Sequence, residues 1–181
     1  MLEFRFHGRG GQGAVTSAEL LALSAIAEGK FAQAFPSFGP ERRGAPVVAY
    51  ARIDEAKVLN RTAVSTPNVV VVLDPSILRI VNTSEGMVDG GTQIVNTSRT
   101  AAEVREAFKL KGRLVTVNAN RIAAEEIGRV ITNTTMLGAL VRAMGVVKRD
   151  TIVEHLKERF GRIAAGNIKA FLRAYEECVI S

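Results

Sequence analysis

Residues 2–13 read LEFRFHGRGGQG, and this stretch decides which fold the chain can adopt. From Leu2 to His7, apolar and polar side chains alternate, which is typical of a β-strand. Four glycines among the next six residues, Gly8 to Gly13, predict a loop, and a long apolar segment begins at Ala14. Glycine lacks a Cβ and reaches positive φ, so such a loop lets an anion approach the N–H groups that begin a helix. The stretch therefore predicts the strand, turn and helix that open a nucleotide-binding α/β unit.

Strand and helix patterns alternate along the rest of the first 130 residues. Residues 68–73 contain five successive valine or leucine side chains, as in a strand covered on both faces of a parallel sheet. Asp74 and Pro75 then fit the N-cap and first position of a short helix through Ile80, a structural role that we favour over a catalytic one. The alternation predicts an α/β fold, a three-layer, doubly wound Rossmann-like sheet with helices on both faces. The predicted strands span residues 2–7, 31–35, 47–53, 68–73, 93–96 and 114–117, and the predicted helices span 14–28, 101–108 and 121–128.

The end of the chain has a different pattern. Helical patterns over residues 132–144, 151–160 and 163–179 are separated by Gly145 and Gly161. Thr151 and Glu154 have the spacing of a capping box, and Asp150 adds favourable charge at the same helix start. With 181 residues and no long linker, we predict a single domain over residues 1–181 that includes this helical tail from about 132 to 179.

The reactive side chains limit the chemistry that the chain can perform alone. It has one cysteine, Cys178, so it cannot form an internal disulfide or supply the several thiolates of an iron–sulfur cluster or structural zinc site. Its two histidines, His7 and His155, offer little material for a metal centre or a histidine-based triad. We therefore predict no metal site and no catalytic residue in this chain.

Charge and hydropathy suggest which partners are absent. The net charge of +6 comes from 24 basic and 18 acidic residues, but the basic ones are scattered among acidic ones, so we do not expect nucleic-acid binding. No apolar run approaches the length of a membrane span, and residues 1–6 read as a strand rather than a secretory signal. We expect a cytoplasmic protein.

A second unusual loop covers residues 36–46, which read PSFGPERRGAP. Three prolines and two glycines make this a stiffened turn that carries Glu41, Arg42 and Arg43. One interpretation is a surface loop with a local Glu–Arg pair, which contributes little energy. The other is that Arg42 or Arg43 presents its donors to a carboxylate or phosphate of a ligand or a partner subunit. The residue types leave these two interpretations equal.

The first loop taken alone also fits a dinucleotide site, because Gly8, Gly10 and Gly13 have the spacing G-x-G-x-x-G. Such a site needs an acidic residue at the end of the second strand to hold the ribose hydroxyls, whereas that strand runs into Pro36 and Ser37. The Gly-Lys-Ser/Thr ending of a P-loop is also missing. A free-standing NAD or S-adenosylmethionine enzyme is therefore disfavoured.

The two loops together resemble a known family. Gly8 to Gly13 and the stretch from Phe35 to Ala45 look like sequence markers of the gamma subunit of 2-oxoacid:ferredoxin oxidoreductases. The second stretch is most similar to the sequence of the pyruvate branch. Residues 133–140, NTTMLGAL, are similar to the third marker of that family, and we expect Asn133 and Thr134 to serve packing. Arg9 departs from the small or apolar residues common at its position, so we assign it no role.

The resemblance implies a subunit of an enzyme complex that converts pyruvate, CoA and oxidised ferredoxin to acetyl-CoA, carbon dioxide and reduced ferredoxin, or that acts on a branched-chain 2-oxoacid. Thiamine diphosphate, Mg²⁺ and iron–sulfur clusters are then expected mostly on alpha, beta and ferredoxin-like delta subunits, and the isolated chain is expected to be inactive. CoA is a further expected contact. The candidate residues for holding a cofactor or a neighbouring subunit are Gly8, Gly10, Gly11, Gln12, Gly13, Phe38, Gly39, Glu41, Arg42, Arg43 and Gly44.

Overall fold

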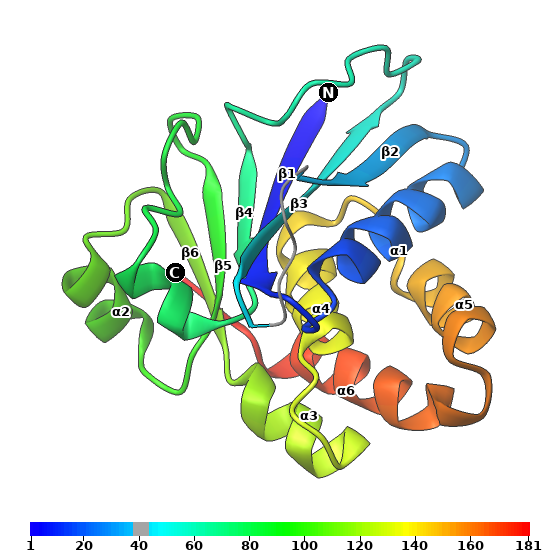
Figure 1. Cartoon of the computed structure of the whole chain (residues 1–181). Coiled ribbons are helices and arrows are strands. Elements are labelled where there is room, and N and C mark those ends of the chain that lie inside the picture. The colour runs from blue at the N-terminus through cyan, green and yellow to red at the C-terminus, as the bar shows by residue number, and fades with distance from the viewer. Residues whose placement is uncertain (38–43) are drawn as a thin grey trace.

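The computed structural model describes residues 1–37 and 44–181, in which helices pack on both faces of a central sheet (Figure 1). The strands are β1 (Leu2–Arg9), β2 (Phe31–Pro36), β3 (Pro46–Asp54), β4 (Val69–Val72), β5 (Thr92–Asn96), β6 (Arg113–Val117) and β7 (Val179–Ile180). The helices are α1 (Ala14–Ala27), α2 (Ala101–Phe108), α3 (Ala119–Ile127), α4 (Asn133–Met144), α5 (Arg149–Phe160) and α6 (Ala164–Glu177), with short 3₁₀ helices η1 (Pro75–Arg79) and η2 (Gly161–Ile163). The predicted α/β fold is confirmed.

The strand order is β2-β3-β1-β4-β5-β6-β7. Strands β1, β4, β5 and β6 are parallel, whereas β3 runs antiparallel to both β1 and β2, and β7 runs antiparallel to β6. After β1 the chain continues through α1 and β2, and β3 then pairs antiparallel with one side of β1. The chain next crosses to β4, which pairs parallel with the other side of β1. Strand β1 lies where the order reverses, which is where open α/β sheets bind their ligands. Because β3 separates β2 from β1, the end of β2 is not placed to supply the ribose ligand of a dinucleotide site.

The core lies on both faces of this sheet. Phe4, Phe6 and Val71 pack on the side covered by α1, α4 and α6, while Val70 and Val72 pack on the side covered by η1 and α2 (Figure 1). All four valines of β4 are fully buried, which confirms the predicted central strand. Each such side chain contributes about 1.5–3 kcal/mol through removal of apolar surface from water.

Three local predictions were wrong. Gly8 and Arg9 extend β1 by pairing with Val47 and Pro46, so the glycine loop begins only at Gly10. The tail is not helical to residue 179, because Val179 and Ile180 form β7 on the edge of β6.

The third error concerns the start of α5. The helix begins at Arg149 and its N-cap, Lys148, makes no side-chain cap, so Thr151 and Glu154 do not form a capping box. The backbone N–H of Lys148 instead donates to the Glu28 carboxylate at 2.7 Å. This contact with the end of α1 fixes the helix start two residues earlier than predicted.

The second face of β1 buries Arg5 and His7. Arg5 donates to the carbonyls of Thr83 and Glu85 and, through Nε, to His7 Nε2 at 3.1 Å, so it ties the segment before β5 to the sheet. Burial and, to a lesser degree, the Arg5 charge lower the pKa of His7 to about 4. His7 is therefore neutral at pH 7 and accepts the hydrogen bond.

This histidine predicts a pH dependence of stability. An unfolded histidine has a pKa near about 6.5, so between pH 6.5 and 4 the unfolded chain binds a proton that the folded chain does not. The free energy of unfolding is then highest above pH 6.5 and loses about 3 kcal/mol from this residue as the pH falls to 4. Urea unfolding of wild type and His7→Gln should give curves that diverge by this amount between pH 7 and pH 4. Parallel curves would show that His7 does not titrate in this way.

Candidate functional site

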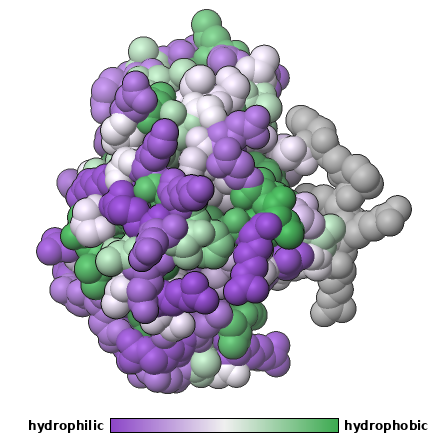
Figure 2. All heavy atoms as spheres, turned by 90° about the vertical axis from the view of Figure 1, so that its left-hand side faces the viewer, coloured by the Kyte–Doolittle hydropathy of each residue, from purple (hydrophilic) through white to green (hydrophobic). Residues whose placement is uncertain are grey.

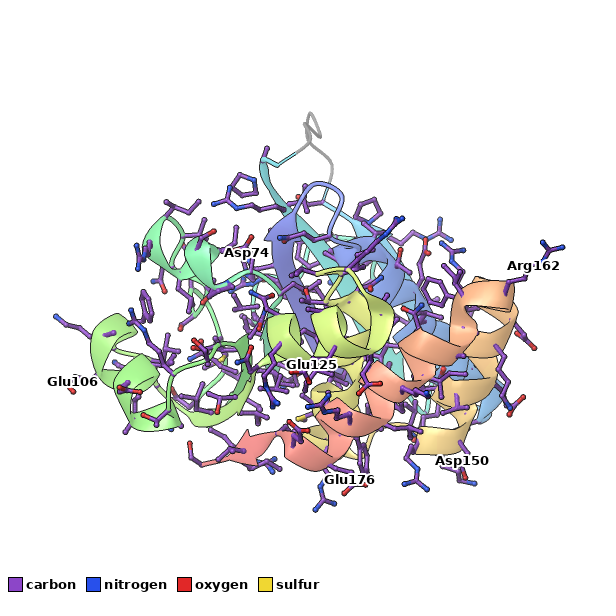
Figure 3. All side chains as sticks on the ribbon, turned by 90° about the horizontal axis from the view of Figure 1, so that it is seen from below. Asp74, Glu106, Glu125, Asp150, Arg162 and Glu176 are labelled. Atoms are coloured by element: carbon purple, nitrogen blue, oxygen red, sulfur yellow. The ribbon has the colours of Figure 1, made fainter. Side chains whose placement is uncertain are left out.

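The carboxyl ends of β1, β4, β5 and β6 meet at one edge of the sheet, which faces the viewer in Figure 3. The glycine loop follows β1 at this edge, and Asp74, which opens η1, follows β4. Asn96 ends β5, and α3 begins after Asn118. The edge therefore gathers residues that are far apart in the sequence.

Two glycines of the first loop adopt the left-handed conformation. Gly11 has φ 92° and Gly13 has φ 80°, which side chains with a Cβ rarely adopt. A Cβ on Gly11 would meet nothing within 4 Å, whereas a Cβ on Gly13 would lie 2.5 Å from Asn133 Nδ2. Gly11 is thus needed for the backbone turn alone. Gly13 is needed for the turn and for the close approach of α4.

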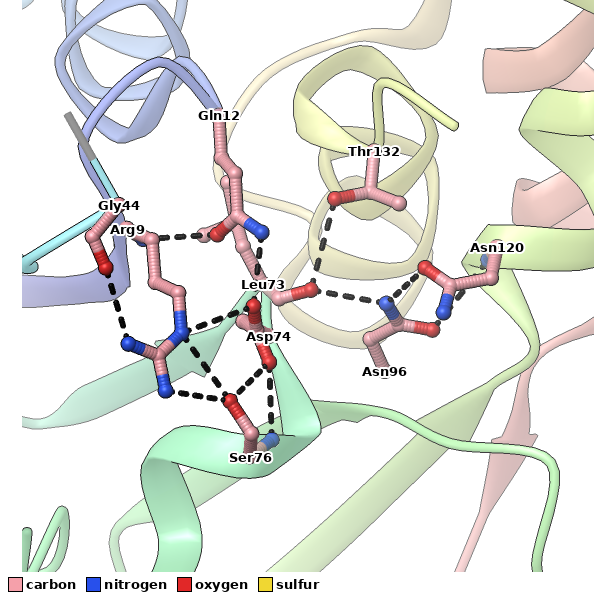
Figure 4. A network of polar contacts seen from close by, with 9 residues as sticks. All are labelled: Arg9, Gln12, Gly44, Leu73, Asp74, Ser76, Asn96, Asn120 and Thr132. Atoms are coloured by element: carbon pink, nitrogen blue, oxygen red, sulfur yellow. Dashed lines mark hydrogen bonds and ion pairs between the residues drawn. The ribbon is translucent and has the colours of Figure 1, made fainter. Parts of the chain in front are cut away.

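Gln12 joins the glycine loop to the end of β4 (Figure 4). Its Oε1 accepts the Arg9 N–H at 2.7 Å, and its Nε2 donates to Asp74 Oδ2 at 2.8 Å. The other Asp74 oxygen accepts from the Ser76 N–H at 2.9 Å and from the Ser76 hydroxyl at 2.6 Å. Burial alone would raise the pKa of Asp74, but the hydrogen bonds from Ser76 and Gln12 outweigh it and lower that pKa. Asp74 is the predicted N-cap and is held as a carboxylate.

Arg9, to which the sequence assigned no role, connects three segments (Figure 4). Its guanidinium donates to the Ser76 hydroxyl at 2.8 and 3.1 Å and to the Gly44 carbonyl at 2.9 Å, and its Nε lies 3.4 Å from Asp74. These contacts tie the glycine loop to η1 and to the end of the second loop. The sequence signal for this role was indirect. It consisted of a lone arginine in the glycine motif and an aspartate after the next parallel strand.

The structure brings the two predicted loops together. The Gly10 N–H donates to the Ala45 carbonyl at 2.9 Å, and the Gly44 N–H donates to the Gly10 carbonyl at 3.2 Å. The end of the second loop is therefore paired with the first. The remaining candidates of that loop lie outside the described residues: Phe38, Gly39, Glu41, Arg42 and Arg43.

Asparagines that sequence reasoning missed tie the neighbouring strand ends together (Figure 4). Asn96 Nδ2 donates to the Leu73 carbonyl and to Asn120 Oδ1, both at 2.8 Å, and its Oδ1 accepts the Ala119 N–H at 3.0 Å. Single asparagines at strand ends give little signal in a sequence, because turns use the same residue type. Their contacts make this edge a connected polar network.

The start of α1 has backbone N–H groups that lack partners among the described residues. Its N-cap, Gly13, has no side chain, and the first turn holds no acidic residue. Within residues 1–37 and 44–181, no acceptor meets the N–H groups of Ala14, Val15 or Thr16. Free N–H groups and the helix dipole favour negative charge at such a position.

The third marker packs α4 beneath this edge. Asn133 and Thr134 are buried, as predicted for packing residues, and the Thr134 hydroxyl donates to Asn167 Oδ1 at 3.1 Å. A Cβ on Gly138 would lie 2.1 Å from the Phe171 carbonyl oxygen. Glycine at this position lets α4 and α6 cross in close backbone contact.

The described part of the chain has no group of three or more His, Cys, Asp or Glu side chains that could hold a metal ion. No described helix has both the length and the apolar character needed to cross a membrane.

The comparisons with known proteins agree with one another. The sequence profile of the family described as "Pyruvate ferredoxin/flavodoxin oxidoreductase" matches residues 3–177. The chain is 50% identical, over 99% of its length and 98% of the relative, to the "Pyruvate/ketoisovalerate oxidoreductases common subunit gamma" of Thermococcus litoralis. It is 46% identical, over 98% of its length and 96% of the relative, to the "Pyruvate synthase subunit PorC" of Methanothermobacter thermautotrophicus.

A solved structure supports the same assignment. The crystal structure of the pyruvate oxidoreductase subunit PORC from Thermotoga maritima matches with a TM-score of 0.88 and 39% identity, covering 99% of this chain and 98% of that chain. The chain thus belongs to the pyruvate ferredoxin/flavodoxin oxidoreductase family, as the gamma subunit of a 2-oxoacid:ferredoxin oxidoreductase.

Proposed function

We propose that this gamma subunit holds the anionic phosphates of CoA at the start of α1 and performs no bond-making chemistry of its own. The observation that carries the proposal is the uncapped first turn of α1 at the carboxyl edge of the sheet, directly after a glycine loop that is open at Gly11. The loop is held rigidly through Gln12 and Arg9, so its amides are in place before a ligand arrives. Such preorganisation lowers the entropic cost of binding.

The second loop supports the same site. Its end, Gly44 and Ala45, pairs with Gly10, and Arg42 and Arg43 directly precede Gly44 in the sequence. Guanidinium groups suit phosphates because they donate two parallel hydrogen bonds. We propose that these arginines meet the phosphates that the α1 amides receive.

The chemistry of the complex then belongs to other chains. Cys178 is the only cysteine, and burial raises the pKa of its thiol, so it is poorly suited to act as a thiolate ligand or nucleophile. We propose that thiamine diphosphate, Mg²⁺ and the iron–sulfur clusters reside mostly on alpha, beta and ferredoxin-like delta subunits. The assembled complex, in the cytoplasm, would convert pyruvate, CoA and oxidised ferredoxin to acetyl-CoA, carbon dioxide and reduced ferredoxin.

A specific observation favours a second 2-oxoacid as a substrate of complexes that contain this chain. The relative from Thermococcus litoralis is named as a subunit common to pyruvate and ketoisovalerate oxidoreductases. We propose that this chain likewise leaves the choice of 2-oxoacid to its partners and is compatible with a branched-chain substrate. Copurification of the tagged chain, with mass identification of its partners, would show which complexes contain it. A monodisperse isolated chain with full oxidoreductase activity would contradict the division of labour.

The CoA contact is tested by calorimetric titration of CoA into the assembled complex. Arg42→Ala and Arg43→Ala should each weaken CoA binding by about tenfold, since each removes charged hydrogen bonds to phosphate. Arg61→Ala is the matched control, because it removes the same charge from an exposed segment elsewhere. If both test variants bind CoA and turn over as wild type does, these arginines do not hold its phosphates.

A further inference from the structure

A cleft opens at the carboxyl edge, between η1 and α2. It has a volume of about 390 Å³ and lies among η1, the segment after β5, α2 and the start of α3. Asp74 and Ser76 stand between it and the glycine loop, with Asp74 turned to Gln12 and Arg9. The cleft is therefore separate from the open start of α1.

The charged groups of this cleft are all basic. Arg79 at the end of η1 and Arg99 before α2 line it, and both are exposed. Neither forms an ion pair with any residue in the two described segments of the chain. No carboxylate lines the cleft, and the nearby Glu103 is held by Thr100 in a capping box. The Arg99 charge also helps to lower the pKa of Glu103, after the hydrogen bonds from Thr100, so one carboxylate stands near two guanidinium groups. This excess of positive charge favours an anionic ligand.

The remaining lining is suited to a larger molecule than a simple anion. Leu78 of η1 and Val104 and Phe108 of α2 supply apolar lining, and Asn118 and Asn120 add side-chain amides. The Asn118 oxygen is used by the Arg121 N–H, which leaves its NH₂ group for a ligand. Figure 2 shows the side of the molecule that carries η1 and α2, where hydrophilic residues surround smaller apolar areas. An apolar wall with a few placed polar groups is typical of a small-molecule site of this volume.

We infer that this cleft binds a nucleoside phosphate, with its phosphate groups at Arg79 and Arg99 and its ring against Leu78 and Phe108. The phosphates of CoA are all on its nucleotide end, which is assigned above to the start of α1, so the ligand of this cleft is a free nucleotide. The cleft lies at the carboxyl ends of parallel strands, where α/β sheets bind ligands. The inference stands apart from the proposed role of α1, because different residues carry it.

The test is a titration of the full chain with fluorescently labelled ADP, in which the fluorescence of the label reports binding. The double variant R79A/R99A should weaken ADP binding at least tenfold. The double variant R129A/R162A removes the same two charges from exposed positions elsewhere and should change it less than twofold. ADP binding that CoA does not displace supports a separate nucleotide site, whereas competition by CoA for the labelled ADP would overturn the inference.

Photo-crosslinking provides a measurement that does not depend on any variant. Azido-ADP should label peptides from residues 75–79 or 96–108, which line the cleft. Absence of saturable ADP binding, equal losses in the two double variants, or labelling confined to other peptides would overturn the inference. These outcomes leave the first turn of α1 and its proposed CoA contact untouched, so the two proposals fail separately.

Discussion

Gly138→Ala should lower the free energy of unfolding by about 3 kcal/mol and reduce the yield of folded chain. A Cβ at this position would lie 2.1 Å from the Phe171 carbonyl oxygen and 3.0 Å from the Tyr175 nitrogen. Both atoms belong to the backbone of α6, so no side-chain rotation relieves the contact and the two helices must move apart. Alanine favours a helix more than glycine does, so helix propensity alone would stabilise the variant. A loss of stability would therefore come from the close contact between α4 and α6. Denaturant unfolding of the purified chain measures it.

Two other glycines provide graded controls for this measurement. A Cβ on Gly166 would lie 2.7 Å from the Glu126 carbonyl, and one on Gly8 would make an ordinary contact of 3.5 Å with the Ala14 Cβ. The expected losses therefore follow the order Gly138→Ala, Gly166→Ala, Gly8→Ala, with the last close to zero. Equal stability of the Gly138 variant and wild type would contradict the close packing of α4 on α6.

Gly13→Ala should cost about 3 kcal/mol as well, and it should also disturb the start of α1. The backbone at φ 80° strains any residue with a Cβ by about 1–2 kcal/mol. The added Cβ would further displace the buried Asn133 side chain, whose nearest atom lies at 2.5 Å. Gly11→Ala has the same kind of backbone strain in open space and should lose only about 1 kcal/mol.

A double-mutant cycle separates strain from crowding. Asn133→Ala should recover about 1 kcal/mol of the loss in Gly13→Ala, because it removes the atoms that the new Cβ would meet. It should not rescue Gly11→Ala, whose Cβ would touch nothing within 4 Å. Purely additive effects in the Gly13 pair would show that the glycine loop and the start of α4 are not in contact.

The sequence predicts those elements whose cause is local. Five apolar residues in succession define β4, and a proline after Asp74 defines η1, because burial and φ preference act on those residues directly. The start of α5 and the strand β7 depend on distant partners, Glu28 and β6, and so give no local signal. The antiparallel return through β3 is likewise a property of pairing, which a strand pattern alone does not reveal.

The candidate site shows the same division. The glycine positions follow from backbone chemistry, and the two loops do meet at Gly10 and Gly44. The role of Asn96 could not be foreseen, because its partners include the Leu73 carbonyl and the Ala119 N–H, each 23 residues away in the sequence. Arg9 had only the indirect signal of an arginine in the glycine motif, because its partner Ser76 is 67 residues away. A polar network at a sheet edge becomes visible only when the strand order is known.

The central claim, that the first turn of α1 receives the phosphates of CoA, is tested most directly by adding a negative charge there. Thr16→Glu places a carboxylate in the first turn of α1, where it stabilises the helix by about 0.3–1 kcal/mol but repels an anion. Ala165→Glu adds the same charge to the first turn of α6 as a matched control. In the titration of CoA into the assembled complex, Thr16→Glu should weaken binding at least tenfold without loss of stability, and Ala165→Glu should leave it unchanged. CoA affinity equal to that of wild type in the Thr16→Glu complex would contradict the account.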